Sequence, residues 1–306
     1  MFGMKSYLGW KIDFLNPKGE AAFAGPESVS WRVFKNPIAL GVGGIAAVLL
    51  EFAEARIRSG VWDHSTFKTD PVGRSRRTGI AAMVGVYGPQ SAARRVIQGV
   101  TNMHARVKGV TPSGQPYSAL DVGLLDWVSA TASYGFLTAY DRFVAPVSDA
   151  DKKRFYREGE AVAHLYGVQH PLTCEADFHA MLDQLLPRFE SHPINTEFLD
   201  IMKSGRAARG VPKGLQSAVV HAAVAILPPA VRERLQLGPE YDLSPRGERV
   251  VRFMGTLAER IPVPASPAGQ ACVRLGLPAT FLWKGPEKQA SILQTLKVGL
   301  AASPAN

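Results

Sequence analysis

The chain has 306 residues, of which 46% are hydrophobic, and carries a formal net charge of +9. This length suits one large domain or two smaller ones, and the apolar content allows a sizeable core. The positive charge favours an anionic partner such as a nucleic acid, a membrane surface or an acidic ligand. However, the basic residues occur in short groups without interleaved aromatic residues, which disfavours nucleic-acid binding. Solvated helix faces explain these groups more simply.

The sequence lacks the short motifs of several other classes of protein. Cys174 and Cys272 lie far apart and form no metal-binding or redox motif, and a Cys-x-x-Cys-His haem attachment site is absent. The first sixteen residues mix charged and aromatic side chains, unlike a signal peptide. The longest apolar run, residues 38–50, is shorter than the ~20 residues of a typical transmembrane helix. We therefore expect a cytoplasmic protein.

The first regular element is predicted to be a helix that begins at Pro37, with Asn36 as its N-cap, and ends before Gly60. Residues 41–46 match a loose Gly-x-Gly-x-x-Ala pattern, but a dinucleotide site needs a strand before this pattern. Small residues inside a helix instead allow a second helix or a flat ligand to approach closely.

Two glutamates follow on the same predicted helix. Glu54 precedes Arg58 by four residues, which predicts an ion pair at the surface. Glu51 has no such explanation and is our candidate for a buried carboxylate.

The next helix is predicted to carry Arg74, Arg77 and Thr78, which are spaced by three and four residues. In a helix they share one face, and this arrangement suits the binding of carboxylates with a hydroxyl group alongside.

Residues 91–109 predict one amphipathic helix, because apolar residues recur at positions 96, 100, 103 and 107. Ser91 is expected to cap its start and Gly109 to end it. His104 lies on or beside the apolar face, and an imidazole costs free energy to bury without a partner. Two interpretations stay open: a core histidine bonded to a carbonyl group, or an axial ligand to a metal or haem.

The remaining elements are also predicted to be helices. A long helix at 121–140 carries Thr131 on the same face as Trp127, either as a core threonine bonded to its own helix or as a hydroxyl that contacts a ligand. Further helices are expected at 148–166, 172–186, 194–202, 215–227 and 231–237, with short helices in the proline-rich tail at 262–306. Since period-two alternation is scarce, the predicted fold is all-α, a single-domain bundle of helices over residues 1–306.

Five segments together resemble the MpaB/rubber-oxygenase family, which includes latex clearing protein and a fungal oxygenase that shortens a farnesyl side chain. They are DHSTFKTDPVGRSRRTG, HARVKG, TPSGQPYSALD, LLDWVSATASYGFLTAY and RFYREGEAVAHLYGV, and the resemblance spans about residues 30–280. It implies a helical fold that encloses a non-covalently bound haem b. Characterised members insert dioxygen across a carbon–carbon double bond of a polyisoprenoid or prenyl chain.

The resemblance also implies roles for individual residues. His104, in the H-x-x-V-x-G segment, would be the proximal iron ligand. Arg74 and Thr78 would lie at the haem, with Thr78 near a propionate. Lys108 and Thr131 would also face propionates.

The chain departs from the family at a few positions. Ser129 stands where many members have histidine, and residues 51–55 lack a common Gln and His-Pro. Some rubber oxygenases place an iron-coordinating lysine where this chain has Arg77, and a guanidinium has no free lone pair for iron. We therefore place Arg77 at the catalytic site as a residue that does not bind iron. Glu51 is the candidate base near the substrate double bond.

Three functions remain open from the sequence. The first is a haem b-dependent oxygenase that uses dioxygen on an apolar, unsaturated small molecule of isoprenoid or lipid type. The second is a haem-binding or sensor protein without catalysis. The third is a helical protein that binds lipids or a membrane surface through its positive charge. The sequence names neither the redox partner nor the oligomeric state.

Overall fold

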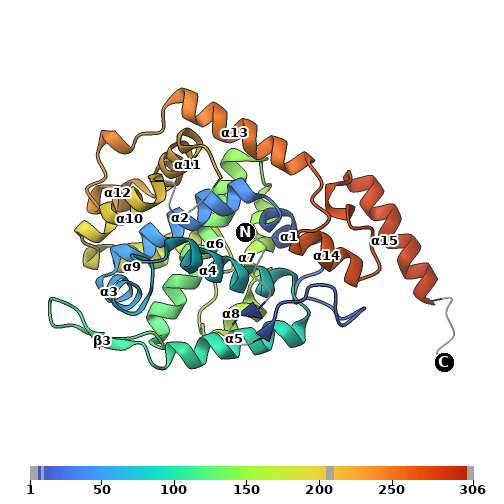
Figure 1. Cartoon of the computed structure of the whole chain (residues 1–306), viewed down its shortest axis with the longest axis horizontal. Coiled ribbons are helices and arrows are strands. Elements are labelled where there is room, and N and C mark those ends of the chain that lie inside the picture. The colour runs from blue at the N-terminus through green and yellow to red at the C-terminus, as the bar shows by residue number, and fades with distance from the viewer. Residues whose placement is uncertain (1–5, 8–9, 205–209, 302–306) are drawn as a thin grey trace.

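The computed structural model describes residues 6–7, 10–204 and 210–301, and their side chains within 11–204 and 210–296. This part of the chain is mainly helical, which confirms the predicted all-α fold class (Figure 1). Its strands form two short antiparallel pairs, β1 (Ser6–Tyr7) with β2 (Trp10–Lys11) and β3 (Lys108–Val110) with β4 (Pro116–Ser118). The predictions for residues 1–16 and 262–306 fall partly outside the described residues.

Two long helices, α2 (Pro37–Ala53) and α6 (Val122–Phe143), pack against each other at the centre of the fold (Figure 1). They touch through two glycines. A Cβ atom on Gly43 would lie 2.7 Å from the carbonyl oxygen of Gly135, and one on Gly135 would lie 2.5 Å from that of Gly43. The small residues of the Gly-x-Gly pattern therefore allow a second helix to approach closely, which is one of the two uses predicted from the sequence.

The start of α2 is confirmed, because the side chain of Asn36 accepts hydrogen bonds from the first backbone N–H groups of the helix. Its predicted end at Gly60 is wrong. Helix α2 ends at Ala53, and α3 (Ala55–His64) continues after a bend of 112°. Glu54 lies at this bend in an extended conformation, and its carboxylate caps α3 by accepting a hydrogen bond from the backbone of Arg56.

The predicted ion pair between Glu54 and Arg58 is also wrong. Glu54 is buried and pairs with Arg56, whose Nε lies 3.0 Å from its Oε1. Arg58 pairs with Glu190 and donates a hydrogen bond to the carbonyl group of Phe52. The break in the helix takes Glu54 out of the regular helical register that an i, i+4 pair requires.

The next two helices are α4 (Pro71–Tyr87) and α5 (Gln90–His104), and α5 is shorter than predicted at its C-terminal end. Ser91 lies inside the first turn and bonds to Glu20 instead of capping the helix. Gly109 lies in strand β3, where a Cβ atom would come within 2.6 Å of the Tyr117 hydroxyl oxygen. Gly114, at φ +86°, lies in the loop that joins the two strands. The hairpin formed by residues 107–118 therefore ends α5 at His104.

The other helices follow the predicted pattern in most places. They are α1 (Val29–Phe34), α7 (Asp149–Glu158), α8 (Glu160–Leu165), α9 (Glu175–Leu185), α10 (Pro193–Lys203), α11 (Lys213–Ala225), α12 (Pro229–Arg234), α14 (Pro267–Arg274) and α15 (Pro286–Ala301), with 3₁₀ turns at Leu186–Arg188, Pro239–Tyr241 and Phe281–Trp283. Helix α1 lies in a segment expected to be irregular, and α15 has 16 residues where short helices were expected.

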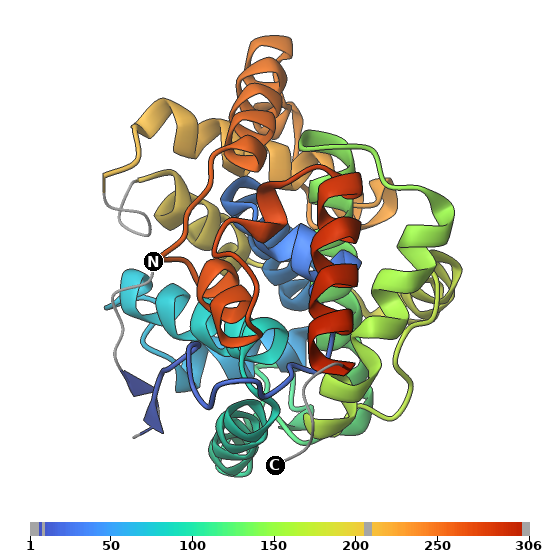
Figure 2. The ribbon, with the colours of Figure 1, turned by 90° about the vertical axis from the view of Figure 1, so that its right-hand side faces the viewer.

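One long element was not predicted. Helix α13 (Pro245–Arg260) begins at Ser244, whose hydroxyl oxygen accepts a hydrogen bond from the backbone of Gly247. It lies at the opposite end of the molecule from α5 in two perpendicular views (Figure 1 and Figure 2).

No single helix in the described part of the chain is both long and apolar enough to cross a membrane. Helices α2 and α3 taken together reach that length and composition, across their bend of 112°.

Candidate active site

A carboxylate on α2 faces the buried side of α6. Thr131 is fully buried, and its Oγ1 lies 3.4 Å from Oε1 of Glu51. The same hydroxyl group donates a shorter hydrogen bond, of 2.9 Å, to the carbonyl oxygen of Val128. A hydroxyl group has one proton, so Thr131 donates it either to this carbonyl oxygen or to the Glu51 carboxylate.

Burial, and not a neighbouring charge, favours the protonated form of Glu51. Burial raises its pKa to about 7, although the positive charge of Arg74 and the hydrogen bond from Thr131 both act in the opposite direction. Glu51 therefore gains and loses its proton near neutral pH, which is the behaviour required of a general acid or base.

Arg74 lies in the first turns of α4, close enough to influence two other groups. Asp70 caps this helix by accepting a hydrogen bond of 2.8 Å from the backbone of Gly73, and Pro71 occupies the first position. The charge of Arg74 lowers the pKa of both Glu51 and His104. Residues from α2, α4 and α5 therefore share one electrostatic environment.

His104 is the last residue of α5 and is half-buried. Burial, followed by the charge of Arg74, lowers the pKa of its imidazole below the ordinary value of 6.5. A helix C-terminus favours a cation, so these two effects outweigh the helix dipole here. The ring is uncharged at neutral pH and keeps a lone pair for a ligand.

The surroundings of His104 differ from those of the other histidines. In the described part of the chain, its ring has no hydrogen-bond or ion-pair partner. Each of the other six rings has one: these are His64 with Tyr117, His164 with Val168, His170 with Asp126, His179 with Glu175, His192 with Ile194 and His221 with Asp242. The interpretation of His104 as a core histidine bonded to a carbonyl group is therefore not supported.

Two of the predicted cofactor-binding residues are exposed. Thr78 is one turn after Arg74 on α4, and its hydroxyl group donates a hydrogen bond of 3.2 Å to the Arg74 carbonyl oxygen. Lys108 is exposed on strand β3, instead of one helical turn beyond His104. Residue 108 is placed by the hairpin, in which the backbone N–H of Val107 bonds to the His104 carbonyl oxygen at 2.9 Å.

The side chain of Arg77 contacts the loop before α4 and not Glu51 or His104. Its Nη2 lies 2.5 Å from Oγ1 of Thr66, and its Nη1 lies 3.7 Å from Oδ2 of Asp70. It therefore contacts the loop before α4, and no contact joins it to Glu51 or His104 among the described side chains. Its assignment as a catalytic residue stays a prediction.

The sequence analysis missed two residues that position this site. Trp127 is fully buried on α6, and its indole Nε1 donates a hydrogen bond of 3.1 Å to the carbonyl oxygen of Leu50, next to Glu51. Tyr117 packs over Gly109 and holds the hairpin that follows His104. The buried face of α6 pointed to Trp127, whereas the turn signal TPSG was the available sign of the hairpin.

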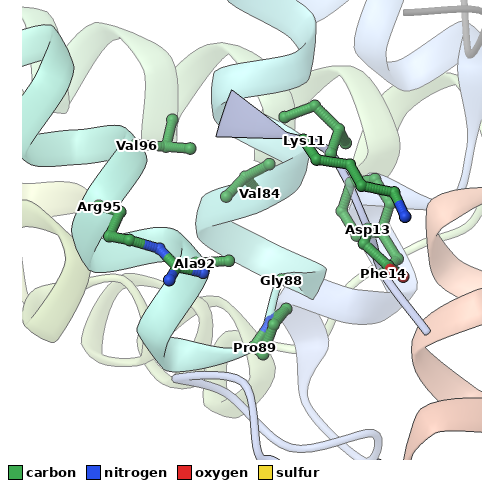
Figure 3. Close-up of a pocket in the computed structure, with 10 residues that line it drawn as sticks. Lys11, Asp13, Phe14, Val84, Gly88, Pro89, Ala92, Arg95 and Val96 are labelled. Carbon is green, nitrogen blue, oxygen red and sulfur yellow. The ribbon is translucent and has the colours of Figure 1, made fainter. Parts of the chain in front are cut away.

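A separate cavity of about 160 Å³ lies beside the N-terminal half of α5 (Figure 3). Its lining includes Arg95 and Val96 of α5, Val84 of α4, and residues 11–14. Arg95 precedes His104 by nine residues, which corresponds to about 14 Å along a helix axis. This cavity is therefore distinct from the group formed by Glu51, Arg74 and His104.

The donor set at His104 suits a haem better than an ion held by protein ligands alone. Within the described residues, no group of three or more His, Cys, Asp or Glu side chains forms a metal site. A haem supplies four nitrogen ligands of its own, so it needs one uncharged imidazole, and its propionates need a cation. The unpartnered ring of His104 and the guanidinium of Arg74 meet these requirements.

The sequence model of a protein family, described as the catalytic domain of ER-bound oxygenase mpaB/B′/rubber oxygenase, matches residues 31–260 of the chain. The chain belongs to this oxygenase family. The matched range contains every candidate residue named above, and it lies within the range of the resemblance seen in the sequence. Neither a curated protein nor a solved structure was found to match the chain. Membership of the mpaB/rubber oxygenase family supports an enzyme that acts with dioxygen on a small molecule.

Proposed function

We propose that the chain is a haem b-dependent oxygenase that uses dioxygen to oxidise or cleave a carbon–carbon double bond in an apolar, unsaturated substrate of isoprenoid or lipid type. The observation that carries this proposal is His104. Its imidazole is half-buried, uncharged and without a hydrogen-bond partner among the described residues, in a chain of the rubber oxygenase family.

Haem b fits this group of residues. His104 would bind the iron through its free lone pair, and Arg74 would pair with a propionate. Thr78, one turn beyond Arg74, is exposed and able to donate to the same propionate. When bound, the haem supplies the dioxygen and one-electron chemistry that no side chain provides.

Thr131 has a different role in this proposal from the one that the resemblance implies. It is fully buried, and its hydroxyl group is engaged by Val128 and Glu51. We therefore assign Thr131 to positioning the Glu51 carboxyl group.

Glu51 is the proposed proton-transfer residue. With a pKa of about 7, its carboxyl group holds a proton in part of the molecules at neutral pH and accepts one in the rest. Arg74 stabilises the ionised form, and burial stabilises the protonated form. This balance allows the Glu51 carboxyl group to hold or release a proton beside the substrate at neutral pH.

The proposal is tested by dioxygen uptake with the haem-loaded protein. A polyunsaturated isoprenoid hydrocarbon is the substrate, and its fully saturated counterpart is the matched control. We expect dioxygen uptake and carbonyl products with the unsaturated compound and neither with the saturated one. With ¹⁸O-labelled dioxygen, the carbonyl products should contain ¹⁸O. Glu51→Gln is expected to lower kcat by about 100-fold or more, the usual range for a lost general base.

Two results would contradict the proposal. Haem-loaded protein that consumes no dioxygen with any unsaturated isoprenoid or lipid would favour the haem-binding or sensor function. Equal uptake with the saturated compound would show that the double bond is not the reacting group.

A further inference from the structure

The outer face of α13 carries exposed apolar side chains. Val250, Phe253, Leu257 and Ile261, the last directly after the helix, are 45%, 66%, 39% and 50% exposed. Spacings of three and four residues place them on one side of the helix, along about 16 Å of its length. We call these four residues the apolar row.

The inner face of α13 is fixed to the core, so the apolar row does not turn inward. A Cβ atom on Gly255 would lie 2.3 Å from the carbonyl oxygen of Phe143, which shows how closely the two backbones approach. Further along, Glu259 accepts a hydrogen bond of 2.9 Å from the Tyr140 hydroxyl group and pairs with the buried Lys35. These contacts fix the rotation of α13 about its axis.

Three exposed arginines, Arg246, Arg249 and Arg260, lie three or four residues from members of the apolar row and therefore beside it, and we call them the basic edge. None of them forms an ion pair with a residue in the described part of the chain. The two glutamates of α13 are taken by other partners, Glu248 by Arg252 and Arg142, and Glu259 by Lys35.

We propose that α13 docks on the surface of an anionic lipid bilayer. The apolar row would enter the interface between headgroups and acyl chains, and the basic edge would contact the lipid phosphates. An amphipathic helix with large apolar residues on one side and arginines beside them is the arrangement that binds such surfaces. The net charge of +9 attracts the molecule to the same surface.

Charge argues against a second copy of the chain as the occupant. A two-fold pairing of α13 with itself brings identical surfaces together, and therefore identical arginines. A single row of four side chains is also small beside the ~800 Å² that each partner buries in a stable interface.

The proposal does not rest on the oxygenase chemistry. Helix α13 and α5, which carries His104, lie at opposite ends of the molecule (Figure 1 and Figure 2). Docking through α13 would therefore hold the protein at a lipid surface and leave the α5 end uncovered.

The test is co-sedimentation of the full chain with vesicles of phosphatidylcholine, alone or mixed with phosphatidylserine. One variant carries Phe253→Ser with Leu257→Ser, and another carries Arg246→Gln with Arg249→Gln. The matched controls are Val110→Ser, at a position 61% exposed on β3, and Lys153→Gln with Arg157→Gln on α7. All substituted side chains are exposed, and circular dichroism checks that each variant is folded.

We expect the wild type to bind the mixed vesicles, and less well at high salt. Each α13 variant should lose about tenfold or more of this affinity, because it loses two inserting side chains or two charges near the lipid. The two controls on β3 and α7 should lose less. The proposal is overturned if the wild type does not bind the mixed vesicles, or if the α13 variants bind as it does. A dimer that Phe253→Ser with Leu257→Ser converts to a monomer would assign the apolar row to a second copy.

Discussion

At the scale of single residues, the site depends on how the charge of Arg74 acts on Glu51 and His104, whose pKa values burial shifts in opposite directions. Burial raises the pKa of Glu51 and lowers that of His104, and both shifts favour the uncharged form. Arg74 opposes the shift of Glu51 and reinforces that of His104. The imidazole is therefore ready to bind a metal at a pH at which the carboxyl group still exchanges its proton.

Replacement of Glu51 by Gln should stabilise the protein in a pH-dependent way. The pKa of this carboxyl group is about 7 in the folded chain, above its ordinary value of 4.5. The folded state therefore loses stability as the pH rises from 4.5 to 7, and glutamine has no such cost. We expect the variant to be more stable above pH 7 by about 3 kcal/mol, and equal to the wild type well below pH 4.5.

Thermal unfolding of both haem-free proteins across this pH range is the measurement. A constant difference at all pH values would show that Glu51 does not titrate as described. A variant that is less stable above pH 7 would show that the charged form of Glu51 is the stabilising one.

At the scale of elements, the contact between α2 and α6 sets the positions of Glu51 and Thr131. The two helices approach closely because Gly43 and Gly135 present no side chain to each other. A methyl group at either position would push the helix backbones apart and with them the carboxyl and hydroxyl groups.

Two adjacent glycines allow a matched test of this contact. Gly43→Ala should lower the free energy of unfolding by about 2 kcal/mol or more, because its Cβ atom would lie 2.7 Å from the backbone of α6. Gly44→Ala should raise it by about 0.5–1 kcal/mol, because its Cβ atom would meet only a side-chain carbon, at 3.8 Å, and alanine favours a helix. Urea denaturation measures both. Equal effects of the two substitutions would contradict the close contact.

The sequence predicted those parts of the elements that depend on neighbouring residues. The N-cap Asn36 and the starts of the helices near residues 121 and 148 were identified, because a cap acts over two or three residues. The ends of α2 and α5 were not, because they depend on distant partners. Glu54 at the bend also faces Arg188, and Tyr117 holds the hairpin that ends α5.

The candidate site shows the same division. Single residues such as Glu51 and His104 were conspicuous in the sequence as polar groups on apolar faces, and the family resemblance assigned roles to His104 and Arg74. Their grouping joins helices that are far apart in the chain, and spacing along the sequence does not contain this information. Arg77 and Lys108 share the local pattern of the site residues, but the structure directs Arg77 to a loop and leaves Lys108 exposed on a strand.

At the scale of the whole molecule, the proposed lipid-binding face and the proposed haem ligand lie at separate ends. Docking through α13 would hold the protein on a lipid surface with the α5 end facing away from the bilayer. Attraction to an anionic lipid surface accounts for the net charge of +9 without a nucleic-acid partner.

The most direct test of the central claim is a titration of haem b into the haem-free protein, followed by absorption spectroscopy. The wild type is compared with His104→Ala and with His164→Ala, in which the ring removed is bonded to the Val168 carbonyl group. We predict a Soret band that saturates at about one haem per chain for the wild type and His164→Ala, and its loss or a strong shift for His104→Ala. A wild type that binds no haem, or a His104→Ala variant with an unchanged spectrum, would contradict the assignment of His104 as the iron ligand.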